Sequence, residues 1–257
     1  VAFSEYSNFN AIRFTLSEEE KMNLRGRIDR VDTYEEDDKV YVRVIDYKSG
    51  NTSFSLLNLY HGLQLQLVVY MNAAMELVGK KNPKKQIEPA GIFYYHVKHP
   101  MIEGTGIESE EEIKNAVLEQ LKLNGLVNDE PNIYRAMDEE LSGSSSVIPV
   151  GLKSDGSLKA TSKVASKEDF SILSEYVNEK ITNIGRQILA GDVAMNPYQL
   201  EKQSGCDYCP YHAVCGFDPR LVGQSYRKLE HFEDSEEIFE KVKEVIIEQL
   251  AVELLLG

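Results

Sequence analysis

The sequence predicts an α/β fold, because strand-like and helix-like segments alternate along its first 100 residues. Residues 40–47 are mostly β-branched or aromatic, which is typical of a strand. Residues 59–79 instead repeat apolar side chains every three or four positions, which indicates a helix. Residues 87–100 are apolar and contain two prolines near their ends, and we expect a further strand there.

An earlier strand is expected at residues 24–32, where apolar and polar side chains alternate imperfectly. The polar residues 33–39 that follow predict a turn. The strands 24–32 and 40–47 should therefore form a β-hairpin. This hairpin would carry Asp29 on its first strand and Asp46 near the end of its second.

The helix predicted at 59–79 should stop at Gly79, because glycine at a helix end and Pro83 soon after it both end helices. Amphipathic periodicity predicts three later helices, and a content of Ser, Gly and Lys predicts a hairpin or mobile loop. The helices are expected at 110–125, 167–191 and 235–256, and the loop at 142–166. We expect the last helix to pack on the core of its own domain rather than on a partner chain.

The composition predicts a globular protein outside the membrane. Of its 257 residues, 42% are hydrophobic, which is enough to bury one substantial core. No apolar run approaches the roughly 20 residues of a membrane helix, and residues 1–10 do not resemble a signal peptide. We therefore expect a cytoplasmic protein without a membrane partner. The chain lacks an initiator methionine, as if it were cut from a longer protein.

The formal net charge of −14 argues against a protein that coats nucleic acid through a basic surface. It leaves open an enzyme that contacts nucleic acid at one metal-lined groove. The acidic residues occur largely in short runs, which we interpret as solvated turns and helix ends.

Asp29, Asp46 and Lys48 form the main candidate site. Neighbouring strands of a hairpin lie roughly 5 Å apart, so the two carboxylates can converge on one face. Two carboxylates and a backbone carbonyl are an oxygen-only ligand set of the kind that Mg²⁺ prefers. A lysine two residues from a ligand can stabilise negative charge that develops beside the metal. Alternatively, Asp46 and Lys48 are a surface ion pair at a turn.

Gln66 and Tyr70 on the predicted helix can complete this site. They are four positions apart, so they share one helix face. Alternatively, Gln66 is an exposed helix former and Tyr70 a core aromatic. If both point at the hairpin, they can contact a phosphate or a base, or support the residues around the metal.

Three segments taken together resemble the RecB-type branch of the PD-(D/E)XK nucleases. The segments GRIDRVD (26–32), VIDYKSG (44–50) and QLVVY (66–70) follow the order and spacing of its G-x-x-D, D-Y-K and Q-x-x-x-Y motifs. The resemblance implies a restriction-endonuclease-like core at about 24–100, with a mixed central sheet flanked by helices. It also implies roles for the motif residues: Asp29, Asp46 and the Tyr47 carbonyl as Mg²⁺ ligands, Lys48 as the catalytic lysine, and Gln66 and Tyr70 lining the site.

A sharper expectation concerns the D-Y-K segment. We expect Asp46 to be a metal ligand and Lys48 not to be its salt-bridge partner. The lysine should instead be aimed at the attacking water and the phosphate. A lysine that points away from both aspartates would favour the surface interpretation.

All three cysteines lie within the segment CDYCPYHAVC (206–215), as Cys206, Cys209 and Cys215. An odd, clustered set without a signal peptide indicates a metal or cluster site in a reducing compartment. With His212 the set makes a complete Cys₃His zinc site. Without it, the three thiolates suit an iron–sulfur cluster whose fourth cysteine comes from elsewhere.

The family resemblance favours the iron–sulfur alternative. Members that carry such a cluster place three cysteines after the nuclease core and one far before it, which implies a 4Fe-4S cluster whose fourth ligand lies upstream of this chain. We therefore expect a nuclease domain over 1–220, with its cysteine cluster at 206–215, and a helical tail over 221–257.

The resemblance also implies the biological role. We expect a Mg²⁺-dependent DNA nuclease that works with a helicase–nuclease partner subunit on double-strand breaks and cuts the strand ending 5′ at the break. Alternatively, the chain is a catalytically silent module that retains a nuclease-like fold for binding DNA ends or a partner.

Overall fold

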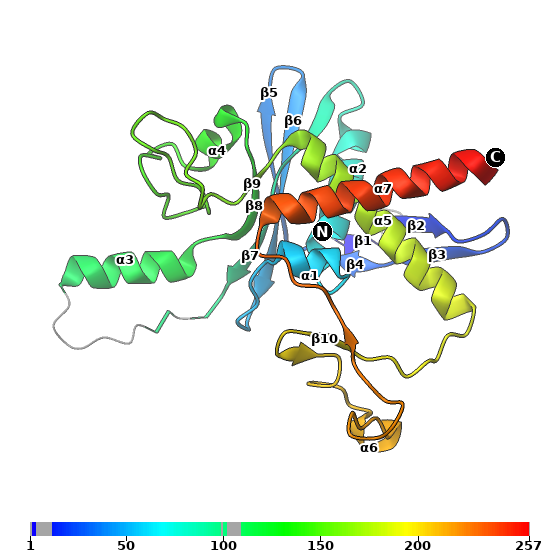
Figure 1. Ribbon diagram of the computed structural model, residues 1–257. Coiled ribbons are helices and arrows are strands. Elements are labelled where there is room, and N and C mark those ends of the chain that lie inside the picture. The colour runs from blue at the N-terminus through cyan, green and yellow to red at the C-terminus, as the bar shows by residue number, and fades with distance from the viewer. Residues whose placement is uncertain (1, 4–11, 99, 102–108, 257) are drawn as a thin grey trace.

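The computed structural model describes residues 2–3, 12–98, 100–101 and 109–256, and it is built around a five-stranded sheet (Figure 1). The strand order is β5-β6-β7-β8-β9, where β5 is Arg30–Glu36, β6 is Lys39–Lys48, β7 is Gln86–His96, β8 is Asn124–Asn128 and β9 is Val164–Ala165. The β5–β6 and β7–β8 pairs are antiparallel, whereas β6–β7 and β8–β9 are parallel. The predicted α/β class and mixed sheet are confirmed.

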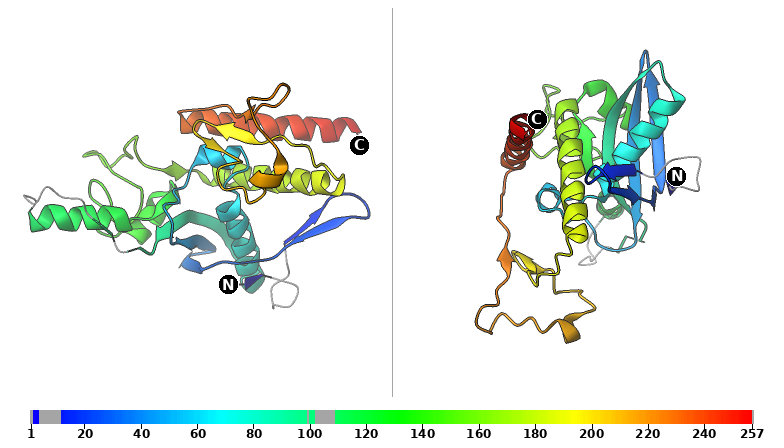
Figure 2. Two further views of the ribbon diagram at one scale, coloured as in Figure 1. Left: turned by 90° about the horizontal axis from the view of Figure 1, so that it is seen from below. Right: turned by 90° about the vertical axis from the view of Figure 1, so that its right-hand side faces the viewer.

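Helices cover both faces of this sheet (Figures 1 and 2). One face carries α1 (Leu56–Tyr60), α2 (Gln66–Lys81), α5 (Lys167–Leu189) and α7 (Ser235–Leu256), and the other carries α4 (Pro131–Met137). Helix α3 (Glu110–Leu121) projects from the body. Helices α1 and α2 form the crossover that parallel strands such as β6 and β7 require.

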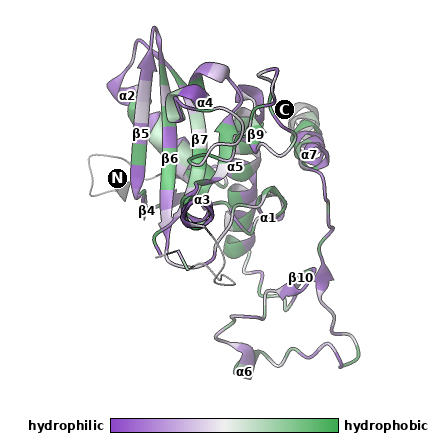
Figure 3. Ribbon diagram, turned by 90° about the vertical axis from the view of Figure 1, so that its left-hand side faces the viewer, coloured by the Kyte–Doolittle hydropathy of each residue, from purple (hydrophilic) through white to green (hydrophobic). Residues whose placement is uncertain are grey.

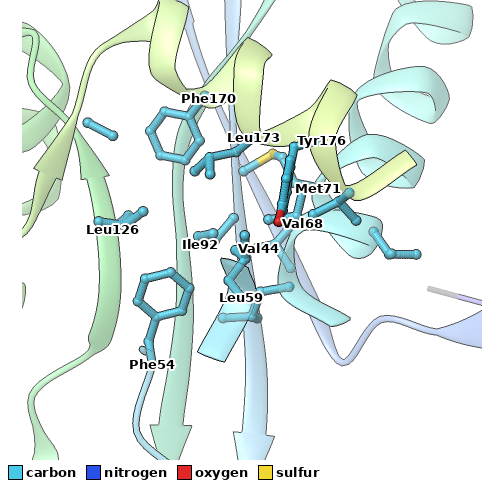
Figure 4. Close-up of a cluster of buried hydrophobic side chains, with 14 of the residues drawn as sticks. Val44, Phe54, Leu59, Val68, Met71, Ile92, Leu126, Phe170, Leu173 and Tyr176 are labelled. Carbon is cyan, nitrogen blue, oxygen red and sulfur yellow. The ribbon is translucent and has the colours of Figure 1, made fainter. Parts of the chain in front are cut away.

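The larger core lies between the sheet and helices α2, α5 and α7. Figure 4 shows the part of this core that lies beside α5. Strand β6 explains this arrangement, because its side chains alternate between the two faces. Val42 and Val44 are fully buried under the helices, while Ile45 faces a second cluster on the other side. A strand that is buried on both faces carries a nearly continuous apolar run, and this run made β6 recognisable in the sequence.

The second cluster is covered by the segment between α4 and β9. Ile148, Val150 and Leu152 are all buried there against Ile45 and other sheet residues. Two isolated antiparallel bridges, Ser144↔Gly151 and Leu152↔Leu158, order the segment. Of the two alternatives for 142–166, the hairpin is therefore closer to the structure.

The predicted strand over 24–32 is wrong in its bounds. Short pairs replace it: β2 (Ile12–Thr15) pairs with β3 (Lys21–Leu24), and β1 (Ala2–Phe3) pairs with β4 (Gly26–Arg27). Strand β5 then begins at Arg30 and extends through most of the expected turn. Tyr34 and Tyr41 pair across this hairpin with stacked rings 6.2 Å apart, which explains why a polar segment stays extended.

The predicted helix over 59–79 is two helices. Helix α1 ends at Tyr60, and α2 begins at Gln66. Between them Gly62 has a φ of +80°, a left-handed conformation that ends α1. Helix α3 is also shorter than predicted, because residues 124–128 pair with β7 as β8.

The cysteines lie in a small lobe, which we define as residues 198–228 and call the cysteine lobe. It contains β10 (Tyr198–Leu200), β11 (Gln203–Ser204), α6 (His212–Cys215) and β12 (Arg227–Lys228). The lobe stands apart from the sheet (Figures 1 and 2). Its residues are less hydrophobic than those of β6 and β7, as the colours in Figure 3 show.

The first half of α7 packs on the body, as expected. Val242 is fully buried, and Ile238 and Phe239 belong to the larger core. Among the helices of the described residues, none has the length and apolar character needed to cross a membrane. The division into a nuclease domain and a tail at residue 221 stays a prediction.

Candidate active site

The candidate site lies where β6 ends. The β5–β6 register pairs Arg30 with Ile45, and one further step places Asp29 opposite Asp46. Residues opposite one another share a face of the sheet. Both carboxylates therefore belong to the face that carries α2. Asp46 is only 4% exposed, whereas Asp29 is exposed in the bend before β5.

A backbone hydrogen bond joins the two aspartates' segments. The N–H of Tyr47 donates to Asp29 Oδ2 at 2.9 Å. This contact orients the Asp29 carboxylate beside the peptide that links Asp46 to Tyr47. The structure thus places Asp29 beside the segment that carries Asp46, as predicted.

Lys48 lies on the same face, and its ammonium contacts both Asp46 on β6 and Gln66 on α2. Its ammonium lies 2.6 Å from Asp46 Oδ2 and donates to Gln66 Oε1 at 2.8 Å. The Gln66 amide nitrogen in turn donates to the Tyr70 hydroxyl at 2.8 Å. The structure therefore brings together the residues predicted from all three motifs.

The expectation that Lys48 is not the salt-bridge partner of Asp46 is wrong. Residues two apart on a strand lie on one face, and a buried carboxylate requires a compensating charge. Lys48 is the cation that the strand places there. The lysine does not point away from the site, so the surface interpretation does not apply either.

Asp46 Oδ2 has a distinctive environment. The oxygen is buried, and it accepts no hydrogen bond from any of the described residues. The Lys48 ammonium is close, but the two groups do not meet with hydrogen-bond geometry. A buried carboxylate oxygen with spare acceptor capacity is suited to a hard cation.

The donor set therefore fits Mg²⁺ chemically. The Asp29 and Asp46 carboxylates with the Tyr47 carbonyl would be the ligands, and all of them are oxygens. Among the described residues, no three His, Cys, Asp or Glu side chains form a metal-binding group. A two-carboxylate site with waters needs no third such side chain.

Tyr94 also belongs to the site, although the sequence analysis did not identify it. It is 3% exposed on β7, directly opposite Asp46 in the parallel register. The Lys48 ammonium lies 5.1 Å from the centre of its ring. Burial raises the pKa of Tyr94 to about 12, and the charge of Asp46 adds to this effect. The phenol is thus neutral at physiological pH.

His96 lies beside Lys48 at the end of β7, two residues beyond Tyr94. It pairs with Lys48 in the register, and its Nε2 lies 2.7 Å from the Thr52 carbonyl oxygen. This contact ties the loop after β6 to the end of β7. Because β6 and β7 are parallel, each predicted site residue on β6 has a counterpart on β7. The register was the information needed to find Tyr94 and His96.

The cysteines do not form a metal centre in the described part of the chain. Cys206, Cys209 and Cys215 are free, and Cys215 is exposed. They do not gather with His212 into a metal-binding group within the described residues. The pKa of Tyr226 is raised, first by burial and then by the neighbouring Cys206. Neither the Cys₃His zinc site nor the iron–sulfur site is confirmed.

Comparison with known proteins identifies relatives of this chain. A relative from Lachnoclostridium phytofermentans is 43% identical over 232 residues, which cover 86% of this chain and 20% of the relative. Relatives from Thermoanaerobacter sp. and Clostridium kluyveri are each 37% identical, over 92% and 96% of this chain and 20% and 22% of their own lengths. All three are named as the B-type subunit of an ATP-dependent helicase/deoxyribonuclease.

The chain thus spans about a fifth of the length of these relatives. The family description "PD-(D/E)XK nuclease superfamily" matches residues 2–216, which include the sheet, the candidate site and the cysteines. The resemblance expected from the three motifs is confirmed. The chain belongs to the PD-(D/E)XK nuclease superfamily.

Proposed function

We propose that this chain is a Mg²⁺-dependent deoxyribonuclease domain, similar to that of AddB, and that it hydrolyses phosphodiester bonds of DNA. The observation that carries the proposal is the buried Asp46 carboxylate, whose Oδ2 accepts no hydrogen bond from the described residues and which lies beside Lys48 and Asp29. Family membership and the names of the relatives support the same activity.

Different residues of the chain would have different roles in hydrolysis. Bound Mg²⁺ would acidify a water and neutralise charge on a phosphoryl oxygen. Asp46 is buried and therefore held in place, and the Tyr47 N–H orients Asp29. Lys48 supplies positive charge where negative charge develops on the phosphate. Gln66 restrains the Lys48 ammonium through its amide oxygen.

The test is cleavage of end-labelled DNA with Mg²⁺ by the intact protein in its native assembly. We expect Asp46→Ala to abolish cleavage at this site and Lys48→Ala to leave only a small residual rate, while the protein stays folded. Asp32→Asn is the matched control, because Asp32 lies on the same hairpin and pairs with Arg43 on the opposite face. Undiminished cleavage by Asp46→Ala would show a catalytically silent module.

We propose that the domain acts within a helicase–nuclease that processes double-strand breaks for recombinational repair. The names of the relatives support a helicase activity and DNA as the substrate. A partner subunit similar to AddA would carry a second nuclease. The three cysteines form no disulfide, which suits a reducing compartment, and we propose a cytoplasmic location.

The strand preference is a separate part of the proposal. We expect this domain to cut the strand that ends 5′ at the break. Substrates labelled at either the 5′ or the 3′ end, digested by the complex with and without Asp46→Ala, separate the two strands. Selective survival of the 5′-ended strand in the variant supports the proposal, and survival of the other strand contradicts it.

We also propose that Cys206, Cys209 and Cys215 bind a 4Fe-4S cluster together with a fourth cysteine from outside this chain. Their C-x₂-C-x₅-C spacing supports the proposal. The cluster would cross-link the cysteine lobe to a distant part of the protein and so restrict the unfolded chain.

Metal analysis of the intact, anaerobically purified protein tests the cluster. We expect a brown protein that contains iron and sulfide, and loss of colour in Cys209→Ser. Asp46→Ala is the control and should stay brown. A colourless protein with one equivalent of zinc would instead support the Cys₃His site with His212.

A further inference from the structure

We propose that Tyr94 is a positioning residue for Lys48, and that the face of its ring holds the lysine ammonium in the active site. The inference rests on the proposed nuclease function and adds to it a residue outside the three motifs. Tyr94 lies on β7, whereas the motif residues lie before β5, at the end of β6 and on α2.

Three groups surround the Lys48 ammonium. Asp46 Oδ2 lies at 2.6 Å, Gln66 Oε1 accepts a hydrogen bond at 2.8 Å, and the Tyr94 ring centre lies at 5.1 Å. These groups come from β6, α2 and β7 respectively. The ammonium is thus close to groups from three different elements of the fold.

The ring is a rigid partner for a flexible side chain. Lysine carries its charge on four methylene groups with freely rotating bonds. Tyr94 is 3% exposed, and its strand is paired on both sides, to β6 at Asp46 and to β8 at Asn124. A cation within about 6 Å of an aromatic face is attracted by the ring quadrupole. Tyr94 therefore provides a fixed point for the Lys48 head group.

The ring also differs from Asp46 in one useful respect. Under the proposed function, the Asp46 carboxylate serves the metal as well as the lysine. The ring face attracts the ammonium but offers no ligand to a divalent cation, so it does not compete for the metal. Together with Gln66, it can hold Lys48 regardless of how Asp46 is engaged.

A core aromatic is the alternative role for Tyr94, because its ring also contacts the larger core. The two roles respond differently to a change in ring electronics at constant shape. Packing depends on volume, whereas attraction of a cation depends on the quadrupole of the ring. Substitution of fluorine for hydrogen weakens the quadrupole and barely changes the volume.

The experiment compares Tyr94→Phe with variants that carry mono-, di- and trifluorinated phenylalanine at position 94. With Tyr94→Phe as the reference, we expect each added fluorine to lower kcat, to about a tenfold loss for the trifluorinated ring, which corresponds to about 1.36 kcal/mol. KM for DNA should stay unchanged, because the ring acts on Lys48 and not on the substrate.

Two controls complete the series. Fluorinated phenylalanines at position 134 should leave kcat unchanged, because Tyr134 is as deeply buried, at 4% exposed, but lies in the cluster on the opposite face. With Lys48→Ala in the background, fluorination at position 94 should no longer affect the residual rate. A kcat that does not depend on fluorination, or a parallel loss at position 134, overturns the proposal.

A second readout does not depend on catalysis. In the intact protein labelled with ¹³C at the lysine ε carbons, the Tyr94 ring current should displace the Lys48 resonance, which Lys48→Arg identifies. Tyr94→Phe should keep the displacement and Tyr94→Met should remove it. A displacement that Tyr94→Met leaves unchanged overturns the contact itself. If the contact is present but Asp46→Ala leaves cleavage intact, the nuclease assignment has failed and the positioning geometry has not.

Discussion

Gln66 and Tyr70 act as one unit on Lys48. The lysine donates to Gln66, and Gln66 donates to the Tyr70 hydroxyl. The order of these bonds means that Tyr70 reaches the lysine through Gln66. Two residues that resembled an exposed helix former and a core aromatic are therefore linked to the candidate site by a specific chain of hydrogen bonds.

We predict that Gln66→Leu lowers kcat by about 10- to 100-fold, because a hydrogen bond to a charged group contributes about 1.5–3 kcal/mol. Tyr70→Phe should cost less, since Lys48 keeps its direct partner. The double variant should match Gln66→Leu alone. Single-turnover cleavage rates measure all three, and additive losses would show that Tyr70 acts independently of Gln66.

Glu88 is a buried carboxylate without a role in the proposed chemistry. It is 1% exposed, at the opposite end of β7 from Tyr94, and it pairs with Lys39 and Lys167. Burial alone would raise the pKa of Glu88, but the hydrogen bonds from Lys167 and Lys39 outweigh it and hold the pKa below its usual value. The ionised carboxylate thus ties β7 to the start of α5.

This ion pair should make stability depend on pH. A carboxyl group whose pKa is lowered by folding stabilises the native state above its unfolded pKa, near 4.3, and loses that contribution as the pH falls through its folded pKa. We predict that Glu88→Gln lowers the free energy of unfolding at pH 7 and flattens its decline below about pH 4.5. Urea unfolding at several pH values measures this. Glu175→Gln, an exposed position on α5, is the control. Parallel pH curves for Glu88→Gln and wild type would contradict the prediction.

At the scale of elements, Gly125 sets how closely β8 approaches β7. A Cβ at this position would lie 1.8 Å from the Ile92 carbonyl oxygen, which is a backbone atom and cannot rotate away. The pairing of Gly125 with Phe93 therefore requires glycine. Strand β8 carries Leu126 and Val127 into the two clusters, so its position affects both faces of the sheet.

We predict that Gly125→Ala destabilises the protein by more than about 2 kcal/mol, because the backbone must move. Gly79→Ala is the matched substitution, and we expect it to stabilise the protein. Gly79 lies within α2, and its Cβ would make an ordinary contact of 3.5 Å with Ile87. Alanine favours a helix by about 0.8–1.0 kcal/mol over glycine. Thermal unfolding of the two variants measures the difference. Equal melting temperatures would show that β8 can move away from β7 without cost.

The elements with long regular patterns were predictable from the sequence. Strand β6, helix α5 and helix α7 lie close to their predicted bounds, because their side-chain periods extend over many residues. Strand β8 was not found, since its five residues begin with Asn and Gly and are too few to show a period. Helix α4 has seven residues and was missed for the same reason.

The candidate site was predictable where it depends on local spacing. Asp46 and Lys48 share a face because of strand geometry, and Gln66 and Tyr70 share a face because of helix geometry. Tyr94 was not predictable in this way, because it follows Asp46 by 48 residues and lies beside it only through the register of two parallel strands. A tyrosine within an apolar strand also gives no indication that a cation lies over its ring.

At the scale of the whole molecule, α7 is part of the body and not only a tail. Its inner side inserts Val242 into the larger core, while Ile247, further along the same helix, is 64% exposed. Helix α7 is also the element that follows the cysteine lobe along the chain. Its packing therefore fixes one of the two connections between that lobe and the body.

We predict that Val242→Asp destabilises the body by more than about 3 kcal/mol, because it buries a charge without a partner. Ile247→Asp, on the same helix, should change stability by less than about 0.5 kcal/mol. Chemical denaturation followed by circular dichroism measures both. A similar loss in the two variants would mean that Ile247 is covered in the intact protein.

The helix α2 that carries Gln66 and Tyr70 is held against the sheet by α5, whose Leu173 and Val177 are fully buried in the shared core. Synthesis on the ribosome proceeds from the N-terminus, so every motif residue emerges before α5 exists. A nascent chain stopped after β7 would contain Asp29, Asp46, Lys48, Gln66 and Tyr70, but its α2 would lack the neighbouring helix with which it shares the core. The order of elements along the gene therefore delays assembly of the proposed active site until α5 has been synthesised, and translation products that stop before α5 should leave DNA intact.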